Sequence, residues 1–212
     1  MAYYRDRAEL LLRCAYPLMK IYRQSDADAL NEFLISDAQT PGKRRSLLSA
    51  PPLYTMDAEY LEGFLKERSV GEKNTDIILA HAAFQRQLTE EILKNDILED
   101  EVPDIPREEF EQYPMSLPLS GAFMEQDILY TYGDYQEHMR QTERFAQNHP
   151  NYRMRRTSAY AFRNLQILLH EGQWAMVSKS RSPAIHFVIH HTKLRLALES
   201  FVPPMTEEAE HI

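Results

Sequence analysis

The sequence is poor in cysteine, glycine and long apolar runs. Cys14 is the one cysteine among 212 residues, so no internal disulfide can form, and a lone thiol is typical of a reducing compartment. With only six glycines, the chain contains neither a P-loop nor the Rossmann glycine fingerprint. No apolar run approaches the roughly 18 residues that span a membrane, and no signal peptide opens the chain. We therefore expect a cytoplasmic protein.

Signatures of catalysis and metal binding are also missing. The chain has no G-x-S-x-G nucleophile motif, no HExxH and no CxxC, which are the arrangements that serine hydrolases and zinc sites need. The formal net charge of −8 argues against a surface that binds nucleic acid as a whole. We therefore predict no cofactor, no metal and no enzymatic activity that the residues alone can name.

What is present is typical of a globular domain. Hydrophobic residues make up 43% of the chain and charged residues 26%, and a chain of this length can bury a core. The charge is uneven, because residues 151–200 hold eight lysines or arginines and two glutamates, whereas residues 57–111 are acidic. Two interpretations stay open: the basic region binds an anionic ligand or an acidic partner, or the two regions complement each other within one fold.

The C-terminal part has the clearest pattern. Residues 165–169 alternate between apolar and polar, a Glu-Gly turn follows, and residues 175–178 resume an extended run, which predicts a β-hairpin with Trp174 just past its turn. Residues 184–189 are rich in β-branched and aromatic types and predict a third strand. Apolar residues at helical spacing over 194–201 then predict a helix, which two prolines end.

The first hundred residues favour helices almost throughout. Apolar residues recur there at spacings of three and four, and the expected helices cover residues 3–22, 27–35, 58–68 and 74–94. Beyond them, residues 98–118 hold four prolines and a dense acidic run, Glu99-Asp100-Glu101, which we interpret as a solvated connector. Residues 132–148 predict a helix and residues 152–157 a strand.

These patterns predict an α+β (or α/β) fold, with a helical N-terminal half followed by a mixed β-sheet with flanking helices. The expected divisions are a helical N-terminal region at 1–97, a proline-rich acidic connector at 98–118, an α+β C-terminal domain at 119–204 and a flexible tail at 205–212.

Several histidines invite a metal hypothesis. His186 and His190 are four residues apart and would share one face of a strand, which a zinc or iron site could use. No carboxylate at ligand spacing accompanies them, so we interpret them as structural or ligand-contacting histidines. His81, on the apolar face of its predicted helix, is interpreted as a core or boundary histidine.

The triplet His191-Thr192-Lys193 follows a hydrophobic strand, and in this it resembles phospholipase-D-like enzymes. In those enzymes the histidine is the nucleophile, the lysine binds phosphate, and an aspartate lies five residues beyond the lysine. Leu198 stands at that position here, and no second H-x-K occurs. Because the route needs two histidines, one to attack and one to protonate the leaving group, we do not expect catalysis by this route. The strand-then-helix setting still predicts a weakly phospholipase-D-like fold at the C-terminus.

Trp174 and nearby tyrosines could line a small-molecule pocket, although ordinary core packing is the simpler interpretation. The candidate ligand-binding residues are Trp174, Lys179, His186, His190, His191, Lys193, Arg163 and Tyr132.

Two long stretches, residues 119–155 and 162–204, carry a wider resemblance, and residues 53–56 belong to it too. About residues 50–204 resemble the C-terminal effector or sensor region of bacterial Cro/repressor-type helix-turn-helix transcriptional regulators. In such regulators the DNA-binding domain lies upstream, and this region senses an effector or oligomerises. The resemblance implies an unknown small-molecule effector and a homodimer, and it supplies no catalytic residues.

One departure from those regulators concerns the first fifty residues. The helix expected at 27–35 is followed by a long loop with Pro41-Gly42 and three basic residues, not by the short turn and recognition helix of a helix-turn-helix. We therefore expect a regulatory domain that contacts DNA only through a separate domain or a partner. The alternatives are a small phosphodiesterase-like hydrolase of an anionic substrate, or a protein–protein adaptor.

Overall fold

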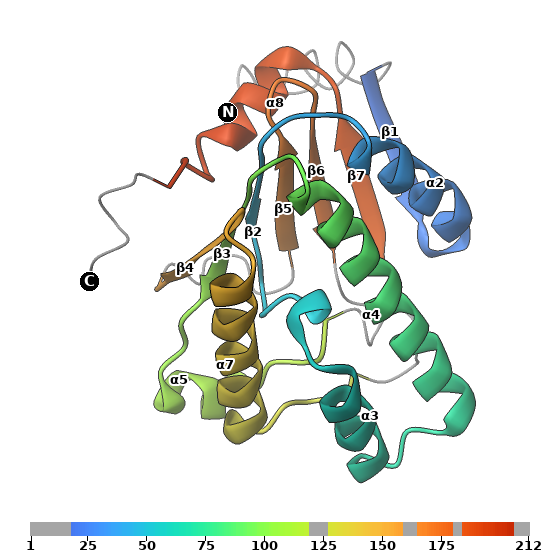
Figure 1. Ribbon diagram of the computed structural model, residues 1–212, viewed down its shortest axis with the longest axis vertical. Coiled ribbons are helices and arrows are strands. Elements are labelled where there is room, and N and C mark those ends of the chain that lie inside the picture. Colours follow the sequence, from blue (N-terminus) through green and yellow to red (C-terminus); the bar gives the residue numbers. More distant parts are fainter. Residues whose placement is uncertain (1–17, 119–126, 159–164, 180–183, 206–212) are drawn as a thin grey trace, which may run out of the picture.

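The computed structural model describes residues 18–118, 127–158, 165–179 and 184–205. They form one α+β fold around a seven-stranded mixed sheet with the strand order β1-β7-β6-β5-β2-β3-β4 (Figure 1). The strands are β1 (Met19–Arg23), β2 (Arg44–Leu47), β3 (Leu98–Pro103), β4 (Tyr152–Thr157), β5 (Leu165–His170), β6 (Trp174–Lys179) and β7 (Ile185–Ile189). The helices are α2 (Ala27–Ala38), α3 (Ala58–Glu67), α4 (Glu72–Leu93), α5 (Arg107–Gln112), α7 (Tyr132–Asn148) and α8 (Thr192–Glu199), with 3-10 turns η2 (Gln24–Asp26) and η3 (Leu53–Thr55).

The direction of the strands changes at β2. This strand pairs in parallel with β3, and β3 in parallel with β4, so helical crossovers connect the three. On its other side β2 pairs antiparallel with β5, and β6, β7 and β1 continue in antiparallel order. From β2, the sheet therefore extends through the parallel strands β3 and β4 to one edge. It extends through the antiparallel strands β5, β6, β7 and β1 to the other edge.

Side chains alternate between the two faces of this sheet. We call the face that carries Asp100 and Trp174 the helical face, because α2, α4 and α7 cover it (Figure 1). There Leu30 of α2 packs in one cluster with Trp174, and Phe145 of α7 packs with Leu98 and Tyr152. The opposite face, called the α8 face, packs Leu198 of α8 against Ile167. A further core lies beyond the sheet, where Leu65 of α3 belongs to one cluster with Ile78 of α4 and Met139 of α7.

Most expected elements are confirmed. The helices expected at 27–35, 58–68, 74–94 and 132–148 correspond to α2, α3, α4 and α7, and the strand at 152–157 is β4. The expected hairpin is formed by β5 and β6, with His170 opposite Trp174 across the turn. The third C-terminal strand and the closing helix are β7 and α8.

The expectation of an almost entirely helical first hundred residues is wrong in three places. Residues 19–22, expected at the end of a helix, belong to β1, which pairs antiparallel with β7; the rest of that expected helix lies outside the described residues. β2 occupies what looked like a loop, and β3 begins at Leu98. In each case pairing with strands distant in the sequence overrides the local spacing.

The interpretation of Glu99-Asp100-Glu101 as a solvated run is also wrong. These residues lie in β3, with 1%, 1% and 7% of their surface exposed. Buried carboxylates need charged or hydrogen-bonding partners, and the neighbouring strands supply them: Glu99 pairs with Arg153, and Glu101 with Arg155.

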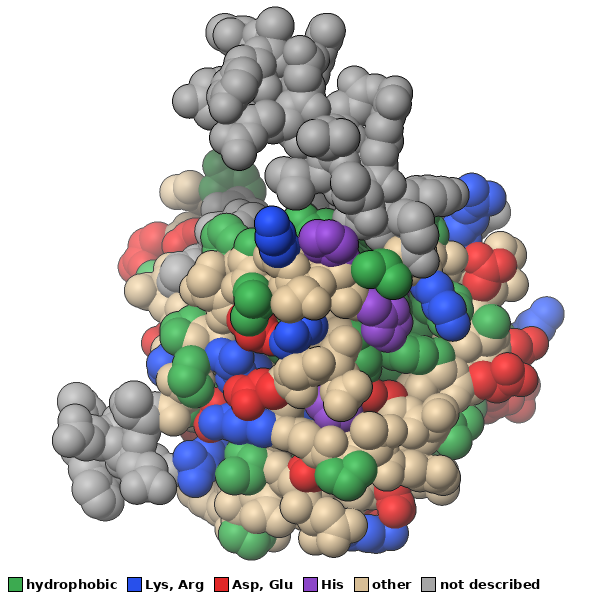
Figure 2. All heavy atoms as spheres, turned by 90° about the horizontal axis from the view of Figure 1, so that it is seen from above, with side chains coloured by type: hydrophobic (Ala, Val, Ile, Leu, Met, Phe, Trp, Pro, Cys, Tyr) green, Lys and Arg blue, Asp and Glu red, His purple; other side chains and the backbone are tan. Residues whose placement is uncertain are grey.

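These ion pairs also bear on the uneven charge of the sequence. Glu99 and Glu101 come from the acidic region and their arginines from the basic region, so the two regions complement each other within one fold. On the end of the molecule seen in Figure 2, basic and acidic side chains are interspersed and do not gather into one patch of either sign. Among the described helices, none combines the length and the apolar character needed to cross a bilayer.

Candidate functional site

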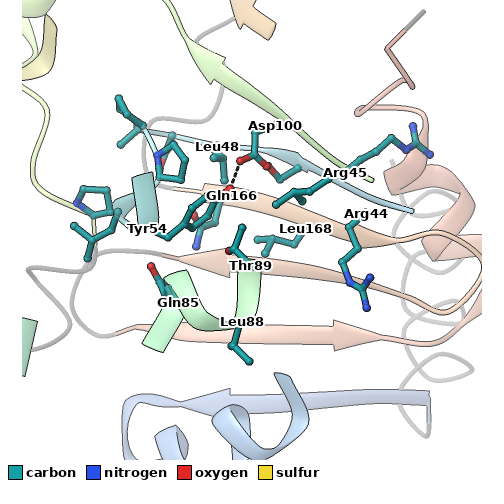
Figure 3. Close-up of a pocket in the computed structure, with 18 of the residues that line it drawn as sticks. Arg44, Arg45, Leu48, Tyr54, Gln85, Leu88, Thr89, Asp100, Gln166 and Leu168 are labelled. Atoms are coloured by element: carbon teal, nitrogen blue, oxygen red, sulfur yellow. Dashed lines mark hydrogen bonds between the residues drawn. The ribbon is translucent and has the colours of Figure 1, made fainter. Parts of the chain in front are cut away.

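A cavity of about 190 Å³ lies between the helical face of the sheet and α4 (Figure 3). Its lining comes from β2, β3, β5 and β6 on the sheet side, and from α2, α4, η3 and residues 115–118 around it. An apolar cavity of roughly 150 Å³ holds a benzene molecule, so this one has room for a substituted ring. The cavity lies beside β2, where the strand direction changes, and it draws on segments more than a hundred residues apart in the sequence.

Much of the lining is apolar. Leucine, isoleucine, methionine and proline side chains surround most of the space: Leu34, Leu48, Pro51, Pro52, Leu53, Leu88, Ile92, Leu98, Met115, Leu117 and Leu168. A ligand here would bury apolar surface, at roughly 25 cal/mol for each Å² removed from water.

Apart from Ser46, Tyr54 and Trp174, which donate to Asp100 or Asp37, five neutral polar side chains interrupt this lining: Ser49, Gln85, Thr89, Ser116 and Gln166. Within the described part of the chain, none of the five side chains makes a hydrogen bond. Thr89 and Ser49 are only 5% and 8% exposed. Buried polar groups nearly always have a partner in the protein or in bound water, so these side chains are available to a ligand. In Figure 3, Gln85 and Thr89 on α4 face the strand that carries Gln166 and Leu168.

A buried carboxylate, that of Asp100, borders the cavity on the β3 side. It accepts hydrogen bonds from the hydroxyls of Ser46, Tyr54 and Tyr152. Burial raises the pKa of Asp100, and the three hydrogen bonds offset only part of that rise. Burial and the nearby carboxylate also raise the pKa of Tyr54 well above its usual value. Because Tyr54 belongs to η3, the cluster fixes η3 to the central strands.

A second polar cluster, centred on Asp37 of α2, borders the cavity on the β6 side. Its carboxylate accepts hydrogen bonds from His170 Nδ1 and Trp174 Nε1, both at 2.7 Å, and from Arg44 Nε at 3.1 Å. Burial alone would raise the pKa of Asp37, but the hydrogen bonds from His170 and Trp174 and the charge of Arg44 outweigh it and lower the pKa. The remaining guanidinium nitrogens of Arg44 donate to the carbonyls of Gly42, Asp37 and Thr40.

Gly42 in this cluster has a conformation and surroundings that exclude a side chain. Its φ of +148° lies in the region that L-residues rarely adopt, and a Cβ there would lie 2.3 Å from His170 Nε2. The loop before β2 therefore closes directly onto the His170 ring, whose two nitrogens face Asp37 and the Pro41 carbonyl.

Of the candidate ligand-binding residues that the structure describes, Trp174 alone is among those that line the cavity. Lys179 ends β6, on the α8 face, and Tyr132 begins α7, where it packs against Phe110. Arg163 lies outside the described residues. The described residues of this set are not brought together at one site.

The candidate histidines are dispersed as well. His186 Nδ1 lies 2.9 Å from the Ser178 hydroxyl on β6, and burial lowers the pKa of His186. Burial and the neighbouring His186 lower the pKa of His81, on α4, to about 4. His190 is exposed at the end of β7. No group of described histidine, cysteine, aspartate or glutamate side chains has an arrangement that could hold a metal ion.

The His191-Thr192-Lys193 triplet lies at the junction of β7 and α8, where His191 is the N-cap residue and Lys193 is exposed. The strand-then-helix setting that the resemblance to phospholipase-D-like enzymes implies is therefore present.

The neutral polar residues that line the cavity were not among the residues predicted to bind a ligand. Gln85 and Thr89 lie one helical turn apart and interrupt the apolar stripe of α4 next to Leu88 and Ile92. Two uncharged polar residues on the inward side of an amphipathic helix were the available signal.

Comparison of the chain with protein-family models, with curated proteins and with solved structures finds no match.

Proposed function

We propose that this chain is the ligand-sensing domain of a bacterial transcriptional regulator, and that its effector binds in the cavity between α4 and the sheet. The observation that carries the proposal is a set of neutral polar side chains, Thr89 above all, that have no hydrogen-bond partner among the described residues and lie on the wall of a mostly apolar cavity. The resemblance of residues 50–204 to the effector region of Cro/repressor-type regulators favours the same function. DNA contact then belongs to a separate domain or a partner chain, and the sensor acts as a homodimer.

The position of the cavity explains how binding could produce a signal. A ligand changes the conformation only if it binds one conformation more tightly than another. One that touches both Thr89 on α4 and Gln166 on β5 stabilises the arrangement in which helix and sheet are close. The Asp100 and Asp37 clusters connect the cavity to η3 and α2, so a shift of α4 relative to the sheet would reach both elements.

The test is a thermal-shift screen of the purified chain against metabolites and nucleotides, followed by hydrogen exchange with each hit. A ligand at 100 times its Kd adds about 2.7 kcal/mol to the free energy of unfolding, and we expect it to slow exchange in α4 and β5. Protection confined to other elements, or a library without hits, would contradict the proposal.

A phosphodiesterase-like hydrolase is the second candidate, because the His191-Thr192-Lys193 triplet keeps its strand-then-helix setting. Its test is hydrolysis of bis(p-nitrophenyl) phosphate by the wild type and by His191→Ala. Turnover that disappears in the variant would favour the hydrolase over the sensor. We expect no turnover, because Leu198 replaces the aspartate of the motif and no second H-x-K exists.

A further inference from the structure

We infer that the cavity selects an uncharged, ring-sized compound whose edge carries an amide, or another group that both donates and accepts hydrogen bonds. This inference rests on the sensor function proposed above, and narrows its effector from any small molecule to one chemical class.

The cations at the cavity are not available to an anionic ligand. Among the described residues that line the cavity, Arg44 and Arg45 are the positively charged ones. Arg44 is held by Asp37, by Asp96 at 3.5 Å and by three carbonyls. Arg45 follows Arg44 in β2, so its side chain lies on the opposite, α8 face of the sheet. There it donates to the Val202 carbonyl and forms an ion pair with Glu171. An anion would lose its hydration here without gaining a charged partner, which is strongly unfavourable.

The carboxylates offer little to a cationic ligand, because most of their acceptor sites are occupied. Asp37 and Asp100 each accept three hydrogen bonds from side chains of the protein. A carboxylate has about four acceptor sites, so each of these two has at most about one site left. A cationic group that needs more than this one site would displace a donor, and the displaced donor would then be left buried without a partner. Leaving a buried polar group without its hydrogen-bond partner is unfavourable.

The groups that remain suit an amide edge. The side chains of Gln85 and Gln166 each offer an N–H donor and a carbonyl acceptor, and the hydroxyls of Ser49 and Thr89 can do either. Gln85 and Thr89 lie on the same side of α4, and Gln166 lies across the cavity on β5 (Figure 3). Leu88, Ile92 and Leu168 leave an apolar space for the ring. A lactam, cyclic imide or aryl amide has this combination of apolar body and paired donor and acceptor.

The experiment compares three probes of one size and different charge: benzamide, benzoate and benzylamine. Binding is followed at millimolar probe concentrations and neutral pH, by ligand-observed NMR and by the fluorescence of Trp174, the one tryptophan of the chain, which lines the cavity. We expect benzamide to bind at least about tenfold more tightly than either charged probe, since a tenfold difference corresponds to about 1.4 kcal/mol, less than the cost of burying an unpaired charge.

Matched variants locate the binding. Thr89→Val removes the hydroxyl and keeps the shape, and we expect it to weaken benzamide binding about fivefold, the effect of one hydrogen bond. Gln87→Leu, at an exposed position of the same helix, is the control and should leave the affinity unchanged. Far-UV circular dichroism and the melting temperature establish that both variants are folded.

The outcomes separate this inference from the sensor proposal. If benzoate or benzylamine binds as tightly as benzamide and competes with it, the neutral-ligand inference is overturned while a ligand-binding cavity stands. If benzamide binds but Thr89→Val has no effect, the assignment of the amide edge to this wall is overturned. If none of the probes binds and the metabolite screen is also silent, both the inference and the sensor proposal fail.

Discussion

At the scale of single residues, buried polar groups determine how the walls of the cavity are held. Asp37 and Asp100 each have three side-chain donors. His138 of α7 is fully buried, with Nε2 3.0 Å from the Pro52 carbonyl and Nδ1 2.9 Å from the Tyr130 hydroxyl. Because a carbonyl only accepts, Nε2 carries the proton, and in the neutral ring Nδ1 accepts from the tyrosine.

Asp37→Asn should destabilise the protein by about 3 kcal/mol, because it removes the charge that balances buried Arg44. The measurement is the free energy of unfolding in urea at neutral pH. Asp28→Asn, at an exposed position of α2, is the matched control and should change it by less than about 0.5 kcal/mol. If Asp37→Asn lowers the free energy of unfolding as little as the control does, Asp96 and the backbone carbonyls are sufficient to stabilise the buried Arg44 guanidinium.

His138 should make stability fall in mild acid. Burial lowers the pKa of His138 to about 4 in the folded state, with the Pro52 hydrogen bond opposing it in part, whereas an unfolded histidine has its ordinary pKa of 6.5. Between those values the unfolded chain binds more protons, so the folded state loses stability as the pH falls from about 6.5 to about 4, by an amount on the order of 3 kcal/mol.

The measurement is urea unfolding from pH 7 to pH 4.5. His138→Gln should flatten the dependence, while exposed His190→Gln should leave it as in the wild type; a residual slope is expected from His81, whose pKa is also lowered. An NMR titration that shows the His138 ring taking up its proton near pH 6.5 in the folded protein would contradict the assignment.

At the scale of elements, α4 lines the cavity on the helical side, and α7 fixes a loop that lines it. α4 supplies Gln85, Leu88, Thr89 and Ile92 to its lining. α7 supplies His138, which holds the Pro52 carbonyl of the loop before η3. The start of α7 is fixed by a capping box, in which the Thr131 hydroxyl accepts from the Asp134 N–H and the Asp134 carboxylate accepts from the Thr131 N–H at 2.7 Å.

Thr131→Ala should lower the free energy of unfolding by about 1 kcal/mol, because one of the unpaired N–H groups at the start of α7 loses its acceptor. Thr131→Ser keeps a hydroxyl in the same place and should restore most of the loss. Thermal unfolding of the three proteins measures the difference. Equal melting temperatures for Thr131→Ala and the wild type would mean that the capping box contributes nothing measurable to α7.

The elements also show how far the sequence alone could lead. α4, α7 and the β5–β6 hairpin follow from local periodicity, because each carries its own apolar pattern. β2 could not be found in this way, since its Arg44-Arg45 pair is buried only because Asp37, Val202 and Glu171 supply partners from distant segments. The acidic residues of β3 are buried for the same reason, with arginines of β4 as partners for Glu99 and Glu101.

The candidate site was less accessible still to sequence reasoning. Trp174 could be singled out as a large aromatic residue after a turn, and it does line the cavity. His186, His190, His191 and Lys193 were predicted to form one site because they are close in sequence. In the structure, side chains alternate along β7 and a new helix begins at α8, so these residues have different surroundings. The space between Thr89 and Gln166 depends on how α4 packs on the sheet. No local sequence pattern specifies that packing.

At the scale of the whole molecule, one sheet unites the chain. β1 and β2 come from residues 1–97 and β3 from residues 98–118, and they pair with strands from residues 119–204. β5 has β2 as one of its two neighbours, and the cavity takes its lining from β2 and β3 as well as from β5 and β6. The helical part and the C-terminal strands therefore share a sheet as well as a site.

Unfolding should accordingly be a single cooperative transition. Trp174 fluorescence reports on the C-terminal strands, and far-UV circular dichroism at 222 nm reports mostly on the helices, which belong largely to the first part of the chain. The two urea curves should have the same midpoint and slope. Midpoints that differ clearly would show that the N-terminal helices and the C-terminal strands unfold as separate units.

The most direct measurement is a fluorescence titration of Trp174 with benzamide, and with the strongest hit of the metabolite screen, in the wild type and in Thr89→Phe. The phenylalanine would occupy the cavity from α4 without adding a charge, and its fold is checked by circular dichroism. The proposed sensor predicts a saturable fluorescence change in the wild type that is absent in Thr89→Phe. An equal change in both proteins, or none in the wild type, would contradict ligand binding in this cavity.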